Sequence, residues 1–217
     1  MSITKHLIAA GALLSLAPLA MAGTFKTITI DGDYSDWADV PVLDSDAADN
    51  VGSVDIADIQ IANDNDFLYI RYTHHTAQSL GTFIALDVDS NVGTGFDVFG
   101  LGLIGSEAGW QNDFPFTQGT ANFNNGFGMS GDFFGSGAAL LDDFSDGSSS
   151  ELAISLDITF NEDGSPVFAD DTFTILLWTD LLNGDVNAPV TYTLAVPEPA
   201  SAAMALVGLA AVAGRRR

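Results

Sequence analysis

Segments in which apolar and polar residues alternate recur through the middle of this 217-residue chain. A period of two is typical of β-strands that bury one face. No long stretch before residue 196 shows the 3.6-residue period of an amphipathic helix, so helices there should be single turns. We therefore predict an all-β fold, an antiparallel β-sandwich of jelly-roll-like type. The predicted strands are residues 25–30, 54–61, 67–72, 82–89, 151–156, 172–178 and 190–194, with weaker ones near 99–104 and 121–129.

The clearest hairpin folds around the Asn- and Asp-rich turn at residues 63–66. In its first strand Ile56, Ile59 and Ile61 cannot all face inward on a strict period of two. We therefore predict a β-bulge near residues 57–58.

The N-terminal end has the pattern of a signal peptide. Lys5 precedes a long uncharged run that ends in the small-x-small sequence Ala-Met-Ala at residues 20–22. We predict a signal helix within residues 1–22 and cleavage before Gly23. The stretch 23–195 is then long enough for one domain with its own core.

The C-terminal end combines three features in order. Residues 196–199 read Val-Pro-Glu-Pro, an extended hinge in which Pro197 and Pro199 lack the N–H that a sheet needs. The uncharged run 200–214 predicts a hydrophobic helix that is short for a transmembrane span, since a span takes roughly 17–25 residues. A closing basic cluster would hold the end on the cytoplasmic side of a membrane. The cluster consists of Arg215, Arg216 and Arg217.

This order resembles the PEP-CTERM sorting signal of bacterial surface proteins, with Pro197, Glu198 and Pro199 as its motif. The resemblance implies processing by an exosortase-type enzyme. It also implies a transient stay in the inner membrane through the C-terminal helix, followed by a cell-surface or extracellular location. An ordinary membrane anchor with a chance Pro-Glu-Pro is the alternative. On either interpretation residues 196–217 form a tail, and the domain before it acts outside the cytoplasm.

The charge of the chain narrows the choice of partners. There are 29 acidic and 6 basic residues, which gives a formal net charge of −23. Between residues 23 and 195 only Lys26 and Arg71 are basic. Such a surface repels nucleic acids and anionic lipid and favours cations or neutral ligands, and plain solvation is the alternative for most of the acids. The absence of cysteine excludes disulfides and thiol chemistry.

One acidic pattern predicts a metal site. Asp87 and Asp89 alternate on a predicted strand and should share a face, and Asn91 follows at the turn. Hard oxygen ligands at alternate positions suit Ca²⁺. A true EF-hand is excluded, because Val92 and Val98 stand where that loop has glycine and its bidentate glutamate. The alternative is a solvated turn whose carboxylates cap backbone N–H groups.

The sequence predicts a different position or role for each of the three tryptophans. Trp37 should plug the edge of the sheet from a single helical turn at residues 34–38. Trp110 lies in a polar, glycine-flanked setting and is a candidate platform for a sugar ring, the alternative being a loop packed over the sandwich. Trp178, at the exit of an apolar strand, is a second candidate, with burial as its alternative.

Several short motifs, the first two at the opening and the others later in the same order, resemble those of family 9 carbohydrate-binding modules and DOMON-like sandwiches. They are Ile-Asp-Gly-Asp at 30–33 before Trp37, Asp-Ile-Gln-Ile-Ala at 58–62, Ile-Ala-Leu-Asp-Val-Asp at 84–89 and Glu-Leu-Ala-Ile at 151–154. The resemblance implies a two-sheet sandwich that binds a sugar or another small ligand.

Catalysis finds little support in the sequence. No serine or histidine has a recognisable catalytic partner, and so many acids guarantee chance carboxylate pairs, so a glycosidase is not indicated. We therefore predict a non-enzymatic, exported β-sandwich that binds polysaccharide or extracellular matrix. The alternative is a structural surface or biofilm-matrix protein without a small-molecule ligand.

Overall fold

A computed structural model describes residues 23–50, 54–76, 81–111, 114–131, 138–140, 147–179 and 184–197. The predicted signal helix and the C-terminal hydrophobic helix lie outside these residues. Within the described ranges the protein is all-β, its only helices are short 3-10 turns, and none of them is long and apolar enough to cross a membrane.

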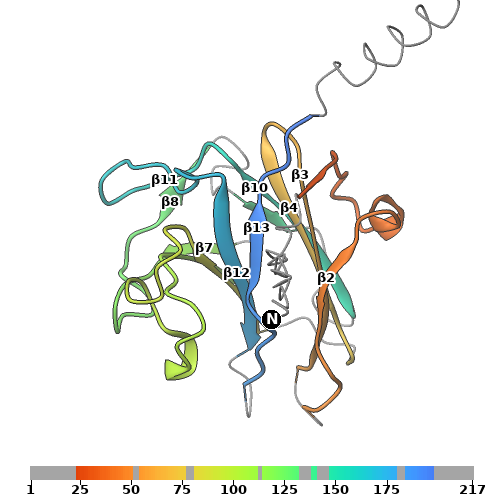
Figure 1. The fold of residues 1–217 in the computed structure, drawn as a ribbon, viewed down its shortest axis with the longest axis horizontal. Helices are drawn as coiled ribbons and strands as arrows, with labels where there is room; N and C mark the ends of the chain where they lie inside the picture. The colour runs from red at the N-terminus through yellow and green to blue at the C-terminus, as the bar shows by residue number, and fades with distance from the viewer. Residues whose placement is uncertain are drawn as a thin grey trace, which may run out of the picture.

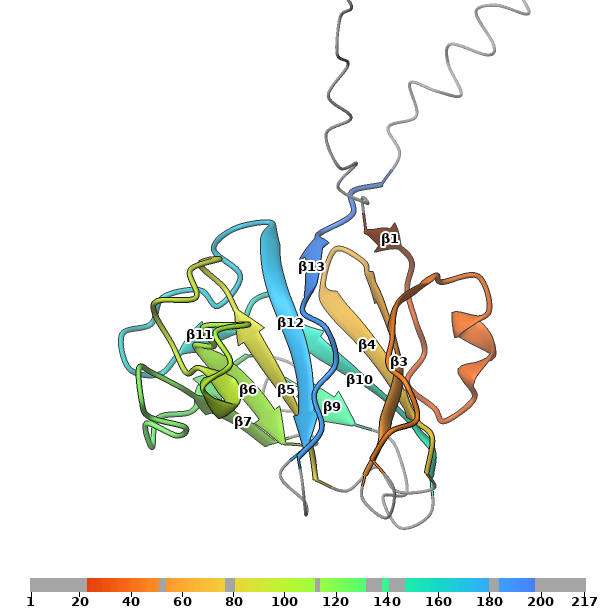
Figure 2. The ribbon, with the colours of Figure 1, turned by 60° about the horizontal axis from the view of Figure 1, so that its bottom comes forward.

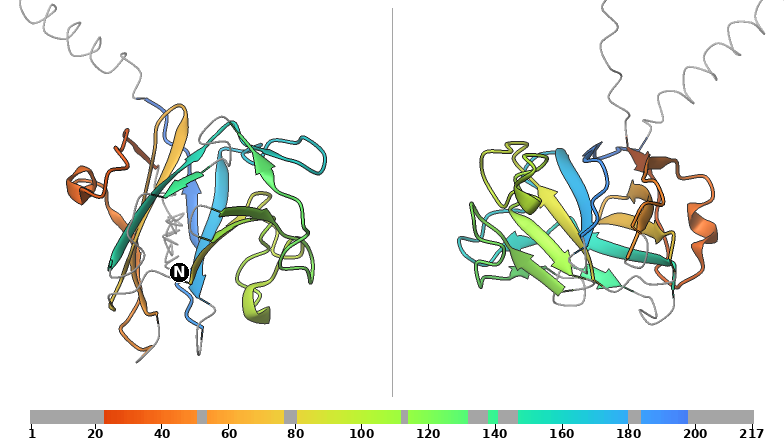
Figure 3. Two further views of the ribbon diagram at one scale, coloured as in Figure 1. Left: turned by 180° about the vertical axis from the view of Figure 1, so that it is seen from behind. Right: turned by 90° about the horizontal axis from the view of Figure 1, so that it is seen from below.

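The strands form two main sheets, shown in Figure 1 and from two further sides in Figure 3. Sheet 1 has the order β1-β3-β4-β10-β9, with β2 also paired to β3, and sheet 2 has the order β13-β12-β5-β6-β7. All pairs are antiparallel except β1 with β3. Sheet 1 contains β1 (Thr24–Phe25), β2 (Val42–Ser45), β3 (Ile56–Asn63), β4 (Phe67–His74), β9 (Ala138–Leu140) and β10 (Ser149–Ser155). Sheet 2 contains β5 (Thr82–Asp87), β6 (Ala108–Gln111), β7 (Phe114–Thr117), β12 (Thr172–Thr179) and β13 (Val190–Thr193). A small pair outside them joins β8 (Met129–Ser130) to β11 (Thr159–Phe160).

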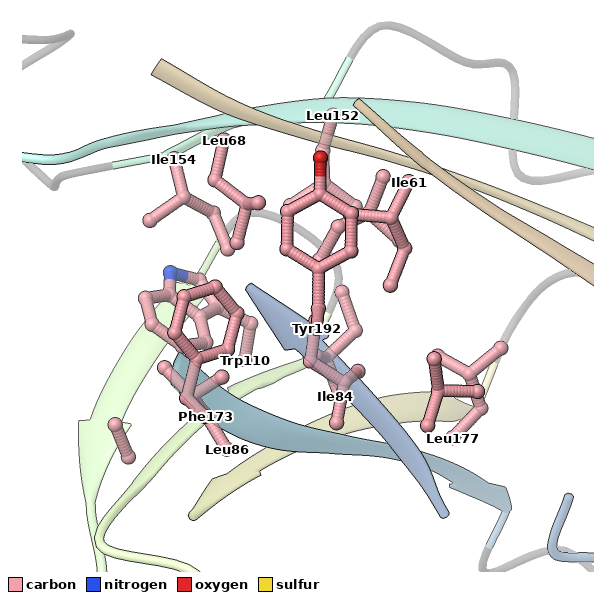
Figure 4. Packing of buried hydrophobic residues seen from close by; sticks show 14 of the residues in the cluster. Ile61, Leu68, Ile84, Leu86, Trp110, Leu152, Ile154, Phe173, Leu177 and Tyr192 are labelled. Atoms are coloured by element: carbon pink, nitrogen blue, oxygen red, sulfur yellow. The ribbon is translucent and has the colours of Figure 1, made fainter. Parts of the chain in front are cut away.

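The two sheets bury a shared apolar core between their inner faces (Figure 4). Leu68 and Leu152 of sheet 1 and Ile84, Leu86 and Phe173 of sheet 2 belong to it. Burial of alternate residues from both sheets is the main stabilising contribution in such an arrangement. The predicted sandwich of two sheets therefore agrees with the structure.

The predicted hairpin is confirmed together with its irregularity. Strands β3 and β4 pair around the turn at 64–66, and the register shifts between Ile56 and Ile59. This bulge lets Ile56, Ile59 and Ile61 all reach the core.

The outer face of sheet 1 is covered by residues 26–41, which include the turn η1 (Tyr34–Trp37). Trp37 is buried, as predicted, but it packs on the face of the sheet against Tyr69 and Ala153 rather than at its edge. The predicted strand 25–30 is wrong beyond Phe25, although Ile28 does face the sheet.

The outer face of sheet 2 carries a second apolar cluster, formed by Phe83, Leu176 and Trp178 under Val98 and Ile104. The last two come from the long connection 88–107, which contains the turn η2 (Val98–Gly100) and lies beside sheet 2 in Figure 1.

Two weakly predicted strands are wrong. Phe99, Gly100 and Gly102 have φ values of 55°, 68° and 66°, and this left-handed backbone cannot continue a strand. Most of the predicted segment 121–129 is also a loop, and only its end enters β8. The strands of this region are β6 and β7 instead.

Both described ends of the domain lie at one end of the molecule, where β1 sits next to the end of β13 (Figure 2). Gly23 N donates to Thr193 O at 3.1 Å. Asn63 holds Ala195 through two hydrogen bonds, from Ala195 N to Oδ1 at 2.8 Å and from Nδ2 to Ala195 O at 2.9 Å. The start of the predicted tail is therefore fixed to sheet 1.

Candidate cation site and adjoining cleft

Three carboxylates converge where the connection 88–107 leaves and rejoins sheet 2. Asp87 ends β5, Asp89 follows it, and Glu107 directly precedes β6. One carboxylate oxygen from each lies within 4.8 Å of the others. We call this group the acidic cluster. Oxygen ligands this close together suit a hard cation such as Ca²⁺.

The outward direction of the cluster follows from the strand pattern. Leu86 lies in the core and Val88 packs against it, so Asp87 and Asp89 point away from the core, as the sequence predicted. Backbone groups then close the turn tightly. A Cβ atom at Gly105 would lie only 2.2 Å from Thr94 O, so a glycine is needed for the two ends of the connection to meet here.

The electrostatics of the cluster are unfavourable without a counter-ion. Burial, followed by the charges of Asp89 and Asp87, raises the pKa of Glu107 to about 7. Burial also raises the pKa of Asp87, which is 2% exposed. It does so although Asp87 accepts hydrogen bonds from the backbone N–H groups of Gly105 and Asn91. Glu107 Oε2 accepts from Val88 N, but Oε1 is buried without a hydrogen-bond partner. A cation would supply the missing interaction.

Neither basic residue of the domain contacts this cluster. Lys26 forms its ion pair with Asp39, and Arg71 bonds to Gln60 and stacks over Tyr34, all on the outer side of sheet 1. The positive charge that would balance the cluster must therefore come from outside the described chain.

The predicted ligand set is only partly assembled. The carboxylates of Asp87 and Asp89 do lie close together. Asn91, by contrast, caps the turn, because its N–H donates to both carboxylates and its Oδ1 accepts from Gly93 N at 3.1 Å. A ligand role for Asn91 stays a prediction. Sequence reasoning missed Glu107, which reaches the cluster through the pairing of β5 with β6, and no local spacing signals that pairing.

A second group of carboxylates, Asp46, Asp49 and Asp185, also lies within 4.8 Å. Burial raises the pKa of Asp46. Asp185 already accepts from the backbone N–H groups of Ile56 and Val186, at 2.7 and 2.8 Å. Its oxygens therefore have protein partners, unlike Glu107 Oε1, and this group is the weaker candidate.

Beside the acidic cluster lies an open cleft of about 210 Å³ between the end of β7 and the turn after β11. Glu107 belongs to both the cluster and the cleft. The other residues that line the cleft are mostly polar. They are Thr117, Gln118, Asn125, Phe160, Glu162, Asp163 and Ser165.

The structure corrects the prediction for Trp110. It lies on β6 in the core between the sheets, 0% exposed, and not in a polar loop (Figure 4). Its position beside glycine misled the sequence reasoning, because Gly109 makes room for Phe116 rather than for a ligand. An indole without an exposed face cannot stack on a sugar, so the platform prediction is wrong here.

Trp178 is also covered, at 6% exposure. Phe83 stacks on its ring with centroids 4.3 Å apart, and Phe99 and Phe123 approach it edge-on at 5.4 and 5.5 Å. The indole therefore has no open ring face, and burial, the alternative weighed for it, is what the structure shows.

Of the sorting motif, Pro197 is the last described residue, and Glu198, Pro199 and the three terminal arginines lie outside the described ranges. The role of this region is identified from its sequence. Residues 195–217 match the PEP-CTERM protein-sorting motif. The PEP-CTERM motif implies export, transient anchoring in the membrane and processing by an exosortase, and so a surface-associated protein.

No curated protein and no solved structure shows significant similarity to the chain. The resemblance of the domain to family 9 carbohydrate-binding modules and DOMON-like sandwiches is therefore carried by the sequence motifs alone.

Proposed function

We propose that this chain is an exported, non-catalytic surface module that holds Ca²⁺ in the acidic cluster and binds neutral carbohydrate of the cell surface or matrix. The observation that carries the proposal is the convergence of Asp87, Asp89 and Glu107, which neither basic residue of the described ranges balances. A bound ion would join the two ends of the connection 88–107. It would thereby fix the loop that covers the outer face of sheet 2.

The ligand class follows from charge and shape. The net charge of −23 disfavours anionic polymers, whereas neutral hydroxyl groups bond well to carboxylates and amides. The cleft next to the cluster offers such groups in a concave site. The raised pKa of Glu107 has a sufficient cause in burial and in the neighbouring carboxylates, so it does not call for an acid catalyst.

A polysaccharide pull-down tests this function. The full chain should be retained by neutral matrix polysaccharide in Ca²⁺ and lost from it in EDTA, without release of reducing ends from the polysaccharide. Absence of binding to every matrix fraction would favour the alternative, a structural matrix protein. Release of reducing ends would instead make the protein an enzyme.

A further inference from the structure

The cleft is lined by a buried side-chain amide whose oxygen is hydrogen-bonded and whose nitrogen is not. Gln118 is 5% exposed and lines the cleft. Its Oε1 accepts from Ser106 Oγ at 2.6 Å. Its Nε2 is buried and has no hydrogen-bond partner. A buried donor without an acceptor is unfavourable, so a ligand or water that accepts from it is favoured.

An unsatisfied acceptor lies on the neighbouring strand. Gln118 N donates to Glu107 O at 2.8 Å, so the two residues are cross-strand neighbours where β6 and β7 meet. Glu107 Oε1 is likewise buried without a partner. An open donor and an open acceptor thus belong to two cross-strand neighbours, at the ends of β7 and β6, that both line one cleft. A hydroxyl group can accept from the first and donate to the second.

The remaining lining residues restrict the ligand. Among the described residues that line the cleft none is basic, and Glu162 and Asp163 add negative charge at its exposed side. Anionic ligands such as phosphates or uronic acids are therefore disfavoured. An amine would satisfy the carboxylates but not the Gln118 donor. Phe160, half-buried, adds an apolar surface of the kind that packs against the C–H face of a sugar ring.

The size of the cleft sets the scale of the ligand. At about 210 Å³ it is smaller than sites for drug-sized molecules, which are roughly 300–1,000 Å³. It therefore suits one sugar residue, with the rest of an oligosaccharide extending into solvent.

We propose that this cleft binds one residue of a neutral saccharide, with a ring hydroxyl that accepts from Gln118 Nε2 and donates to the Glu107 carboxylate, whose lone pairs allow it to bind the cation of the acidic cluster as well. This inference rests on the proposed carbohydrate function and assigns it to a place that the tryptophans do not occupy.

The test uses the full chain in Ca²⁺ and a panel of neutral gluco-, xylo-, manno- and galacto-oligosaccharides, measured by saturation-transfer NMR and titration calorimetry. Gln118→Met keeps the side-chain length but removes the donor, and it should weaken the best ligand at least tenfold. Glu162→Trp fills the exposed side of the cleft from a surface position, and it should abolish binding without affecting the fold. Gln111→Met is the matched control, because Gln111 is an exposed glutamine of β6 outside the cleft.

The outcomes separate the two proposals. Loss of binding in Gln118→Met and Glu162→Trp but not in Gln111→Met supports the cleft. If Gln118→Met does not fold, Glu162→Trp alone decides. Equal binding by all the variants overturns the cleft and leaves carbohydrate binding elsewhere on the domain. Failure of every oligosaccharide to bind the wild-type chain overturns both, and the cleft then holds only water.

Discussion

Two glutamates of this domain, one buried and one half-buried, have opposite surroundings. Glu151, on β10, is 0% exposed and accepts from the backbone N–H groups of Asp31 and Gly32 and from the indole of Trp37, at 3.0, 2.7 and 2.8 Å. Glu107 shares its position with two other carboxylates and keeps one buried oxygen unbonded. The first therefore stabilises the fold, whereas the second keeps one oxygen available to a ligand.

Replacing Glu151 by alanine should be strongly destabilising. The change leaves three donors over sheet 1 without their acceptor, at a cost of about 3 kcal/mol or more in unfolding free energy. Urea denaturation followed by tryptophan fluorescence measures this cost. Glu162→Ala, an exposed glutamate, should stay within about 0.5 kcal/mol of wild type. A similarly small effect for Glu151→Ala would show that residues 26–41 do not depend on this carboxylate.

The pH dependence of stability should reveal Glu107. Its folded-state pKa of about 7 lies above the ordinary glutamate value of 4.5, so its contribution to stability is fully present below pH 4.5 and is lost as the pH rises through 7. Without divalent cations, raising the pH from 5 to 7.5 should cost up to about 2 kcal/mol through this group. His74, whose pKa is lowered to about 4 by burial and then by His75, acts in the opposite direction as the pH falls below 6.5.

Comparison of wild type with Glu107→Gln isolates the effect, because His74 is common to both chains. The difference in unfolding free energy, measured in EDTA, should change between pH 5 and 7.5. A constant difference would mean that Glu107 ionises normally.

At the residue scale the sequence predicted the pair Asp87 and Asp89 and the burial of Trp37, because both depend on local alternation and turn chemistry. It could not predict Glu107 or the burial of Trp110, because each depends on which strand pairs with which. Composition around Trp110 suggested a polar loop, whereas its pairing with Ile84 places it in the core.

At the scale of elements, strands with clean alternation and Asn- or Asp-rich turns were predictable, and β3, β4, β5, β10, β12 and β13 lie close to their expected positions. The structure of the glycine-rich middle of the chain was not predictable. There the chain covers sheet 2 with a left-handed backbone and aromatic contacts, which have no period in the sequence.

The side chain of Asn63 holds Ala195, the residue before the predicted tail, to sheet 1. Besides Ala195 it accepts from Tyr192 Oη at 2.9 Å, and it is buried. Asn63→Ala should therefore cost about 2 kcal/mol and increase hydrogen exchange at residues 192–195. Asn65→Ala, in the exposed turn beside it, is the matched control. Unchanged exchange at 192–195 would show that the tail leaves the domain without this anchor.

At the scale of the whole molecule, the two ends of the described domain lie at one side, so residue 196, where the predicted tail begins, is near the mature N-terminus that we predict at Gly23. Deletion of 196–217 should release exported, soluble protein, since the predicted apolar helix and arginines are then absent. Fractionation of cells that express both forms measures this. Unchanged membrane residence of the truncated chain would contradict a sorting role for the tail.

The stability of the full chain as a function of Ca²⁺ concentration tests the proposed cation site most directly. At 100 times its Kd, Ca²⁺ should raise the unfolding free energy of wild type by about 2.7 kcal/mol. Asp89→Asn and Glu107→Gln should remove most of that gain, whereas Asp66→Asn, which removes the same charge from an exposed turn, should keep it. An equal rise with Mg²⁺ or NaCl, or in all three variants, would show general relief of repulsion among the acids and contradict a cation site at Asp87, Asp89 and Glu107.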